Sequence, residues 1–145
     1  MDPVVRVVPH GSREYLEALD LRRRVLRWPL GLEYTEEQIA AESAETHFLA
    51  YLGERCVGSL TMAPRSEEVV KMRQVAVDGD FQSRGIGGSL VQASESWAQE
   101  SGFERIELHA RQSALPFYER LGYRTLGAPF EEVGIPHRKM VKEIR

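Results

Sequence analysis

One stretch, Gln74–Ser89, limits the folds open to this chain more than any other, because it describes a strand, a glycine-rich turn and the start of a helix. Val75, Ala76 and Val77 form a short apolar run that predicts a strand. A polar segment containing a glycine follows, and apolar residues then recur at helical spacing from Ile86 onward. The glycine turn is therefore predicted to lie at the N-terminus of a helix.

The backbone amides from Gly85 to Gly88 can point into one concavity at such a turn, with the positive end of the helix dipole behind them. Glycine also lets a ligand approach the backbone closely. Arg84 adds a planar guanidinium whose donors match phosphate oxygens. These features favour a phosphate site, although an ordinary flexible strand-to-helix loop can carry the same glycines.

The sequence of this turn matches neither of two common phosphate-binding loops. The tripeptide Gly87-Gly88-Ser89 lacks the lysine of a Walker A loop, and Leu90 stands where a dinucleotide fingerprint needs its third glycine. The segment Gln82-Ser83-Arg84-Gly85-Ile86-Gly87 instead resembles the Gln/Arg-x-x-Gly-x-Gly/Ala loop of the GNAT superfamily of acetyl-CoA-dependent N-acyltransferases. The resemblance implies that this loop binds the pyrophosphate of coenzyme A.

Two later segments support the same resemblance. The segment from Ala114 to Tyr123, ALPFYERLGY, resembles the late helix of the family, which ends in FYxxxGF/Y. The tail from Phe130 to His137, followed by Met140, is similar to a bacterial ElaA-like branch. The resemblance is strong from Met72 to Met140, whereas the first half of the chain matches only in layout.

The resemblance implies a mixed α/β fold, a GNAT-type twisted and mostly antiparallel sheet of about seven strands with about four helices, in the order β-α-α-β-β-β-α-β-α-β-β. Apolar patterns predict the strands Val4–Val8, His47–Leu52, Val57–Ala63, Val69–Val77, Arg105–Ala110, Tyr123–Leu126 and Gly134–Val141. Helices are predicted after Ser12, from Thr35 to about Ala41, from Gly85 to about Ser101, and from Ser113 to Leu121.

The first helix and the segment after it carry two further expectations. Its buried stripe is predicted to contain Tyr15, Leu16, Leu19, Val25 and Leu26. A solvated basic face is favoured over a patch near the coenzyme or an acidic partner, because the helix carries Arg22, Arg23, Arg24 and Arg27. Pro29 disfavours a helical Trp28, so the helix is expected to break there.

Composition sets the remaining limits. At 145 residues the chain is predicted to form one domain, residues 1–145. A net charge of -3 gives no electrostatic reason to expect nucleic acid as a partner. Cys56 is the single cysteine, which points to a buried thiol in a reducing cytoplasm. No signal-like or membrane-spanning stretch is evident, so a cytoplasmic monomer or homodimer that needs no metal is expected.

The resemblance also assigns coenzyme contacts. Backbone groups of the strand before the loop are expected to pair with the pantetheine arm like an added strand, and the loop to hold the diphosphate. Arg120 or Arg111 is available for the 3′-phosphate. The full expected set is Val75, Ala76, Val77, Gln82, Ser83, Arg84, Gly85, Ile86, Gly87, Gly88, Ser89, Phe117 and Arg120.

Acyl transfer from a thioester to an amine needs an acid near the sulfur and a base or water near the amine. Tyr118 stands at the position of the family tyrosine that donates to the departing sulfur; otherwise it is a buried helical tyrosine. His109, at the end of a strand, is the candidate base, either directly or through water, or it is simply hydrogen-bonded. Glu107 is the other carboxylate within reach.

The acceptor side is less constrained. The loop after the first helix borders the acceptor site in GNAT proteins, which implies a role for Trp28 and Leu30 unless they pack over the core. His137 forms a polar cluster with Glu131 and Glu132 that either binds the acceptor amine or orders its loop. The predicted function is an enzyme that acetylates a small-molecule or peptide amine. The alternatives are a module that senses acyl-CoA without turnover, and a nucleotide-binding regulator.

Overall fold

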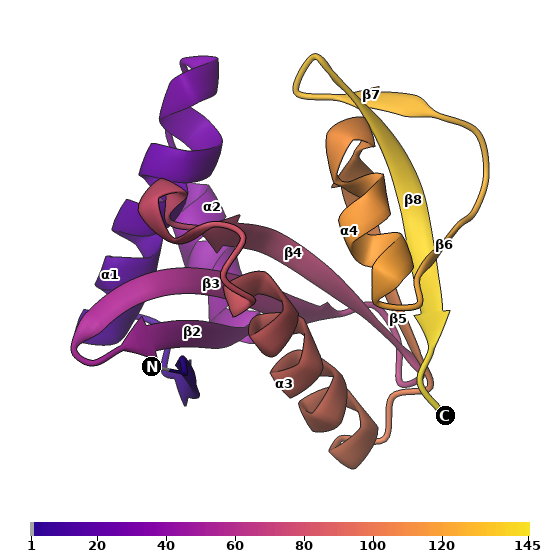
Figure 1. The fold of residues 1–145 in the computed structure, drawn as a ribbon, viewed down its shortest axis with the longest axis horizontal. Helices are drawn as coiled ribbons and strands as arrows, with labels where there is room; N and C mark the ends of the chain where they lie inside the picture. The colour runs from indigo at the N-terminus through magenta and orange to yellow at the C-terminus, as the bar shows by residue number, and fades with distance from the viewer. Residues whose placement is uncertain (1) are drawn as a thin grey trace. The chain divides into compact units, whose positions relative to one another are not determined.

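The computed structural model describes residues 2–145 (Figure 1). In this part of the chain the strands join one eight-stranded sheet in the order β1-β2-β3-β4-β5-β8-β6, with β7 paired to β8. The strands are β1 Val4–Val8, β2 Thr46–Leu52, β3 Arg55–Pro64, β4 Val69–Val77, β5 Arg105–Arg111, β6 Arg124–Thr125, β7 Phe130–Glu132 and β8 Ile135–Glu143. The α-helices are α1 Arg13–Arg22, α2 Glu36–Ala41, α3 Ile86–Glu100 and α4 Leu115–Arg120.

The mixed α/β class and the mostly antiparallel sheet are as predicted, with β4 and β5 forming a parallel pair. The chain divides into two compact units. The first comprises the chain up to Ala63 together with Gln74–Ser94, and the second comprises Pro64–Arg73 together with Glu95–Arg145. Both β4 and α3 are therefore divided between the two units.

In the first unit, α1 begins where the sequence predicts. The Ser12 hydroxyl caps the helix by accepting from the amide of Tyr15 at 3.1 Å. The residues buried along α1 are Tyr15, Ala18, Leu19, Leu21 and Arg22. Leu16 is 59% exposed, so its predicted place in the buried stripe is wrong. It lies about 100° around the helix from Tyr15, which puts it outside the i, i+3, i+4, i+7 face.

Arg22 also corrects the sequence prediction. It is fully buried, with 0% exposure, instead of lying on a solvated face. Its two terminal nitrogens donate to the carboxylate of Glu42 at 2.9 and 2.5 Å, and the Tyr15 hydroxyl donates to the same carboxylate at 2.9 Å. A charged side chain is tolerated in a protein interior only when it is paired and hydrogen-bonded. The distant Glu42 supplies that pairing.

The expected helix break at Trp28 is also wrong. Backbone angles of φ -60° and ψ -38° keep Trp28 helical, and a π turn over Arg23–Arg27 runs into a 3-10 turn over Trp28–Leu30. Pro29 occupies an early position of that 3-10 turn, where no N–H donor is required. Gly31, with φ 70°, ends the turn. Trp28 is 51% exposed, so it does not pack into the core.

The strand-to-helix packing of the first unit depends on Gly58. The strands β2 and β3 form an antiparallel hairpin (Figure 1). A Cβ atom at Gly58 would lie 2.8 Å from Leu90 Cδ1 and 3.0 Å from Ile86 Cγ2. Because a glycine stands here, the first turns of α3 can lie directly on β3. The start of α3, and with it the preceding loop, is positioned by this contact.

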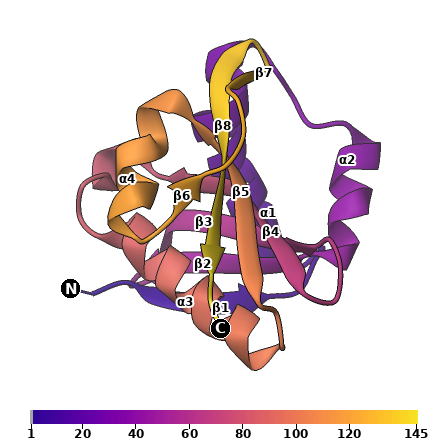
Figure 2. The same cartoon turned by 90° about the vertical axis from the view of Figure 1, so that its right-hand side faces the viewer.

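In the second unit, β4 pairs in parallel with β5 from Val69 to Met72. The full length of β5 then pairs antiparallel with β8 (Figure 2). The alternation predicted for β5 is present, with Ile106, Leu108 and Ala110 buried.

The short strand β7 and its turn were not predicted. Two left-handed residues, Val133 with φ 47° and Gly134 with φ 73°, connect β7 to β8. The predicted strand Tyr123–Leu126 is confirmed only as the two-residue β6. Among residues 2–145, no helix is long and apolar enough to cross a bilayer.

Candidate active site

The turn that follows β4 is organised by Asp78, which is 4% exposed. Its carboxylate accepts from the amide of Asp80 at 3.0 Å and lies 3.3 Å from Arg55 Nη2 and 3.6 Å from Arg24 Nη1. The amide of Asp80 and, next to it, the guanidinium of Arg55 lower the pKa of Asp78 below its usual value. A permanently charged carboxylate therefore fixes the short 3-10 turn Gly79–Phe81.

The glycine loop contains two left-handed residues, Ser83 and Gly85, with φ of 64° and 80°. The Gln82 side chain donates to the carbonyl of Val77 at 3.3 Å, which ties the loop to the end of β4. The amide of Ser89 makes a hydrogen bond to the carbonyl of Gly85 at 3.0 Å. The earlier amides precede this first helical bond and are the ones that a helix N-terminus leaves for a ligand.

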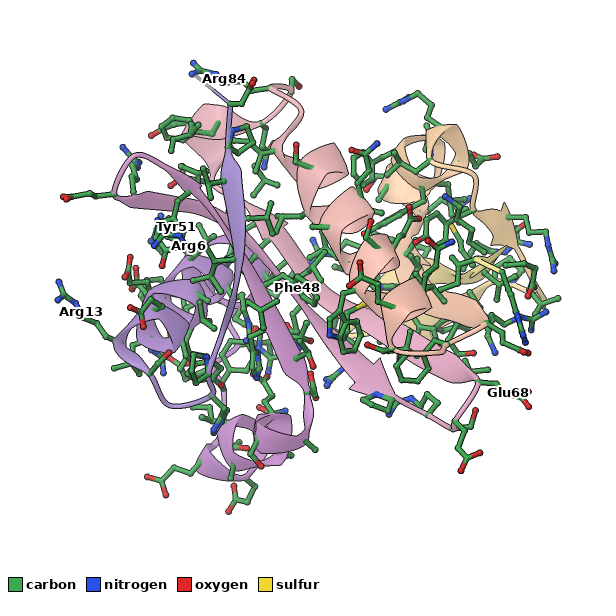
Figure 3. The ribbon with its side chains drawn as sticks, turned by 90° about the horizontal axis from the view of Figure 1, so that it is seen from below. Arg6, Arg13, Phe48, Tyr51, Glu68 and Arg84 are labelled. Carbon is green, nitrogen blue, oxygen red and sulfur yellow. The ribbon has the colours of Figure 1, made fainter. Side chains whose placement is uncertain are left out.

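The outer side of this loop is open and positively charged. A Cβ atom at Gly88 would meet nothing within 4 Å. Arg84 is exposed, and its side chain extends away from the ribbon (Figure 3). The guanidinium carbons of Arg84 and Arg55 lie 5.2 and 4.7 Å from the centroid of the Phe81 ring. This aromatic ring therefore supports two cations beside the loop.

The strand that leads into the loop is kinked. Gln74 has φ of 57°, which interrupts the extended conformation of β4 before Val75. Beyond the kink, Val75 and Val77 are half-buried and Ala76 is buried. The Gln74 side-chain oxygen accepts from the Tyr34 hydroxyl at 2.8 Å. A non-glycine residue is uncommon at such a φ, and such residues often occur at functional sites.

Tyr118, in the second unit, is 7% exposed on α4. Its ring packs edge-on against Phe117 and Tyr123, with centroids 4.9 and 5.9 Å apart. Burial raises the pKa of Tyr118 above that of an ordinary phenol, so the hydroxyl is a proton donor. The neighbouring Tyr123 hydroxyl donates to Glu95 at 2.9 Å.

His109 lies between groups of opposite charge. Its Nδ1 atom is 3.1 Å from Glu132 Oε1 and 3.3 Å from Lys71 Nζ. Burial lowers the pKa of Lys71, and its ammonium is within hydrogen-bond reach of the ring. The two contacts use the same ring nitrogen, so only one of them can be a hydrogen bond at a time.

His137 belongs to the same cluster. It is 4% exposed, its Nδ1 atom donates to the carbonyl of Ile135 at 2.7 Å, and its Nε2 atom lies 3.7 Å from Glu132. The Phe130 ring contacts His137 and also His109, with centroid distances of 6.0 and 5.0 Å. Of the two glutamates that the sequence proposed around His137, the structure places Glu132 beside it, and Glu131 is paired with Pro136 in the sheet.

A sequence model of the family described as "Acetyltransferase (GNAT) domain" matches residues 29–144. The chain belongs to the GNAT acetyltransferase family. Among curated proteins, it is 29% identical to the "Uncharacterized N-acetyltransferase YjcF" of Bacillus subtilis over 138 residues, which cover 94% of this chain and 98% of YjcF. This agreement extends the GNAT assignment to the first half of the chain.

Solved GNAT-type structures show the same fold. Escherichia coli ElaA aligns with a TM-score of 0.82 at 21% identity and covers 98% of this chain and 100% of ElaA. The ElaA-like resemblance predicted from the sequence is thereby confirmed at the level of the fold. A GNAT family acetyltransferase from Elizabethkingia anophelis, solved with acetyl-CoA bound, aligns with a TM-score of 0.76 at 18% identity and covers 97% of each chain. Coenzyme A is thus the type of co-substrate that this fold accommodates.

The remaining residues predicted for the GNAT site are less clustered. Trp28 donates to Glu33 at 3.3 Å, Leu30 is half-buried, and Arg120 is exposed at the end of α4. Glu107 lies 3.2 Å from Lys139, with which it forms an ion pair. The structure defines the surroundings of each of these side chains, and it assigns a ligand to none of them.

Several residues of the site were missed in the sequence. Lys71 contacts His109 and Phe81 contacts Arg84, and Asp78 organises the turn before the glycine loop, yet single residues of these kinds in a strand or turn have no distinctive spacing. Only Asp78 had a usable signal, because an aspartate directly after a strand is a common turn former. Within residues 2–145, no group of three or more His, Cys, Asp or Glu side chains is arranged to hold a metal ion. Cys56, predicted to be a buried thiol, is half-buried, and this burial raises its pKa to about 11.

Proposed function

We propose that this GNAT protein is an N-acetyltransferase that moves acetyl from acetyl-CoA to a primary amine by direct attack in a ternary complex. The carrying observation is the glycine loop, with left-handed Ser83 and Gly85 directly before α3. Helix N-terminal amides and open space above the loop suit a diphosphate. In this proposal the diphosphate contacts the residues from Gln82 to Ser89, and Val75–Val77 pair with the pantetheine arm.

Two further contacts complete the proposed coenzyme site. Phe117 is half-buried beside Tyr118, where its ring can pack on the pantetheine arm. Arg120 is exposed in the last turn of α4, which suits a contact with the 3′-phosphate. Binding both substrates in one orientation can supply roughly 7 to 11 kcal/mol of the barrier by proximity alone.

The proposed chemistry uses two side chains. The neutral amine attacks the thioester carbonyl, a tetrahedral oxyanion forms, and the carbon–sulfur bond breaks to release the thiolate. Tyr118 protonates the departing sulfur; its place in the FYxxxGF/Y segment and a phenol that is protonated at neutral pH support this role. His109 removes the surplus proton from the amine, directly or through water, and its contact with Glu132 supports that assignment.

The acceptor is proposed to be a small-molecule or peptide primary amine. Trp28 is half exposed, and Leu30 follows it in the same 3-10 turn, so together they offer an apolar surface in the loop after α1. Glu107 and His137 are the proposed polar contacts of the acceptor. The side chains leave the identity of the amine open.

The coenzyme site is tested by Gly88→Asp, with Gly88→Asn as the matched neutral control. Gly88 lies in the first turn of α3, has ordinary φ and has open space above it, so either side chain fits the fold. A carboxylate in the first turn stabilises a helix, whereas it repels a bound diphosphate. We expect calorimetry to show coenzyme A binding to the Asn variant and none to the Asp variant, with the thermal midpoint of Gly88→Asp no lower than that of Gly88→Asn.

Three results would count against the proposal. Equal coenzyme A affinity in the two variants would remove the diphosphate from this loop. Binding of coenzyme A and acetyl-CoA by the wild-type chain, without thiol release across a panel of primary amines, would favour the acyl-CoA-sensing module instead. A larger thermal shift with ATP or NAD than with coenzyme A would favour a nucleotide-binding regulator.

A further inference from the structure

Gln74 holds an unusual conformation for its residue type. Its φ of 57° lies in the left-handed region, which glycine and asparagine adopt far more readily than glutamine. A glycine at this position would kink β4 without strain. The glutamine side chain therefore needs a compensating contact, and the hydrogen bond that it accepts from the Tyr34 hydroxyl at 2.8 Å provides one.

Tyr34 is held by contacts to its hydroxyl, its ring and its backbone amide. It is 7% exposed, and its hydroxyl accepts from Arg22 Nε at 3.3 Å. The guanidinium carbons of Arg22 and Arg27 lie 4.8 and 4.5 Å from the ring centroid. Its backbone amide donates to Glu33 at 2.7 Å. Because Arg22 is itself fixed by Glu42, the Tyr34 hydroxyl is a rigid donor presented to β4.

We propose that Tyr34 is a positioning residue that locks the kink of β4 through Gln74 and thereby sets the backbone of Val75–Val77 for the pantetheine arm. This inference rests on the proposed coenzyme function and adds a residue outside the glycine loop to it. The hydrogen bond between Tyr34 and Gln74 lies within the first unit and does not involve the loop proposed to hold the diphosphate. Its loss should therefore affect the pantetheine arm and spare the diphosphate.

Two ligands separate these contributions. Coenzyme A carries the pantetheine arm on its nucleotide diphosphate, whereas 3′-phosphoadenosine 5′-diphosphate carries the same nucleotide and diphosphate without the arm. We expect Tyr34→Phe, which removes only the hydroxyl, to weaken coenzyme A binding about tenfold, the effect of one lost hydrogen bond. Affinity for 3′-phosphoadenosine 5′-diphosphate should stay within about twofold of wild type, which is less than one hydrogen bond contributes.

The chain offers a matched control in Tyr15. This tyrosine is also buried and packs with Tyr34, but its hydroxyl donates to Glu42 instead of to Gln74. Tyr15→Phe should lower the thermal midpoint and leave coenzyme A affinity at the wild-type value. The double variant Tyr34→Phe/Gln74→Gly should recover coenzyme A affinity, because glycine adopts the kink without a restraining hydrogen bond. Amide exchange at Val75–Val77 should be faster in Tyr34→Phe and return in the double variant.

The outcomes are distinguishable. If wild type binds neither ligand, the proposed function fails and this inference fails with it. If wild type binds both, then unchanged coenzyme A affinity in Tyr34→Phe overturns the lock alone. Equal weakening for the two ligands, or no recovery in the double variant, also overturns it, since either result indicates a general loss of structure.

Discussion

Arg22 and Glu42 form a bidentate ion pair in the interior, with side chains only 1% and 3% exposed. The pair joins the last residue of α1 to the short 3-10 turn Glu42–Ala44 that precedes β2. Hydrogen bonds from Arg22 lower the pKa of Glu42 even though burial alone would raise it. The Glu42 carboxylate is therefore ionised at neutral pH, and its charge is tolerated in the interior because Arg22 is paired with it.

Removing one member of this pair should be costly. We expect Arg22→Met to lower the free energy of unfolding in urea by about 3 to 5 kcal/mol, since it leaves Glu42 buried and unpaired. Arg23→Met serves as a control, because its ion pair with Glu33 is solvent-exposed, and it should change stability by less than about 1 kcal/mol. The double variant Arg22→Met/Glu42→Leu should regain much of the loss. Equal effects of the two single variants would contradict this account.

Stability should fall in mild acid through His47. This ring is 2% exposed and contacts the carbonyl of Glu42 at 2.9 Å. Burial lowers its pKa below the ordinary value of 6.5, so the folded state favours the neutral ring. Its stabilisation is thus complete above pH 6.5 and is lost as the pH falls through that value toward the folded pKa.

The measurement is the thermal midpoint between pH 7 and pH 5. We expect it to fall with decreasing pH in the wild type and to fall less steeply in His47→Gln, which cannot take up a proton. Because the folded pKa of Glu42 is also lowered, a second loss should follow below about pH 4 in both proteins, as this carboxylate becomes protonated. Identical slopes above pH 5 would exclude His47 as the source.

The acid role of Tyr118 can be separated from its packing. Tyr118→Phe should reduce kcat by about 10² to 10⁴ and leave the Kd for coenzyme A unchanged, because only a proton donor is lost. Tyr123→Phe removes the other buried phenol on the same cluster, the one that is bonded to Glu95. It should lower the thermal midpoint without affecting kcat. A Tyr118→Phe enzyme with wild-type kcat would require another donor.

Packing under α3 should control coenzyme affinity. Gly58→Ala forces a methyl group to within 2.8 Å of Leu90, so we expect a loss of about 1 to 3 kcal/mol in stability and weaker coenzyme A binding. Gly79→Ala is a suitable comparison, since a Cβ there meets nothing within 4 Å and φ is ordinary. If calorimetry gave the two variants the same affinity for coenzyme A, α3 would not need this contact.

The sequence predicted the features that depend on local chemistry. Ser12 and Thr35 cap their helices, Gly102 ends α3 with φ 90°, and β4 has its predicted bounds Val69–Val77. The strand, turn and helix around the glycine loop were equally predictable, because their periodicity changes within a few residues. The site residues were predicted by their places in the chain, and their roles in catalysis and binding stay predictions.

Features that depend on distant partners were not predictable. The sequence around Arg22 predicts a surface residue, because nothing local indicates that Glu42 lies beside it. Trp28 stays helical because the chain changes to a 3-10 turn, an accommodation that residue preferences do not encode. The kink at Gln74 likewise depends on Tyr34, 40 positions earlier. For Arg22 and Gln74 a tertiary contact outweighs a local preference of about 1 kcal/mol, whereas for Trp28 a local change of helix type removes the conflict.

The shared nitrogen of His109 decides which tautomer the ring can hold. When Lys71 donates to Nδ1, the hydrogen of the neutral ring must sit on Nε2, and that atom cannot take a proton from an amine. When Nδ1–H donates to Glu132, Nε2 is a bare acceptor. Glu132 ends β7, the short strand that no pattern indicated. In the proposed reaction, Glu132 would thus select the basic form of the imidazole, and Lys71 the form that cannot accept the proton.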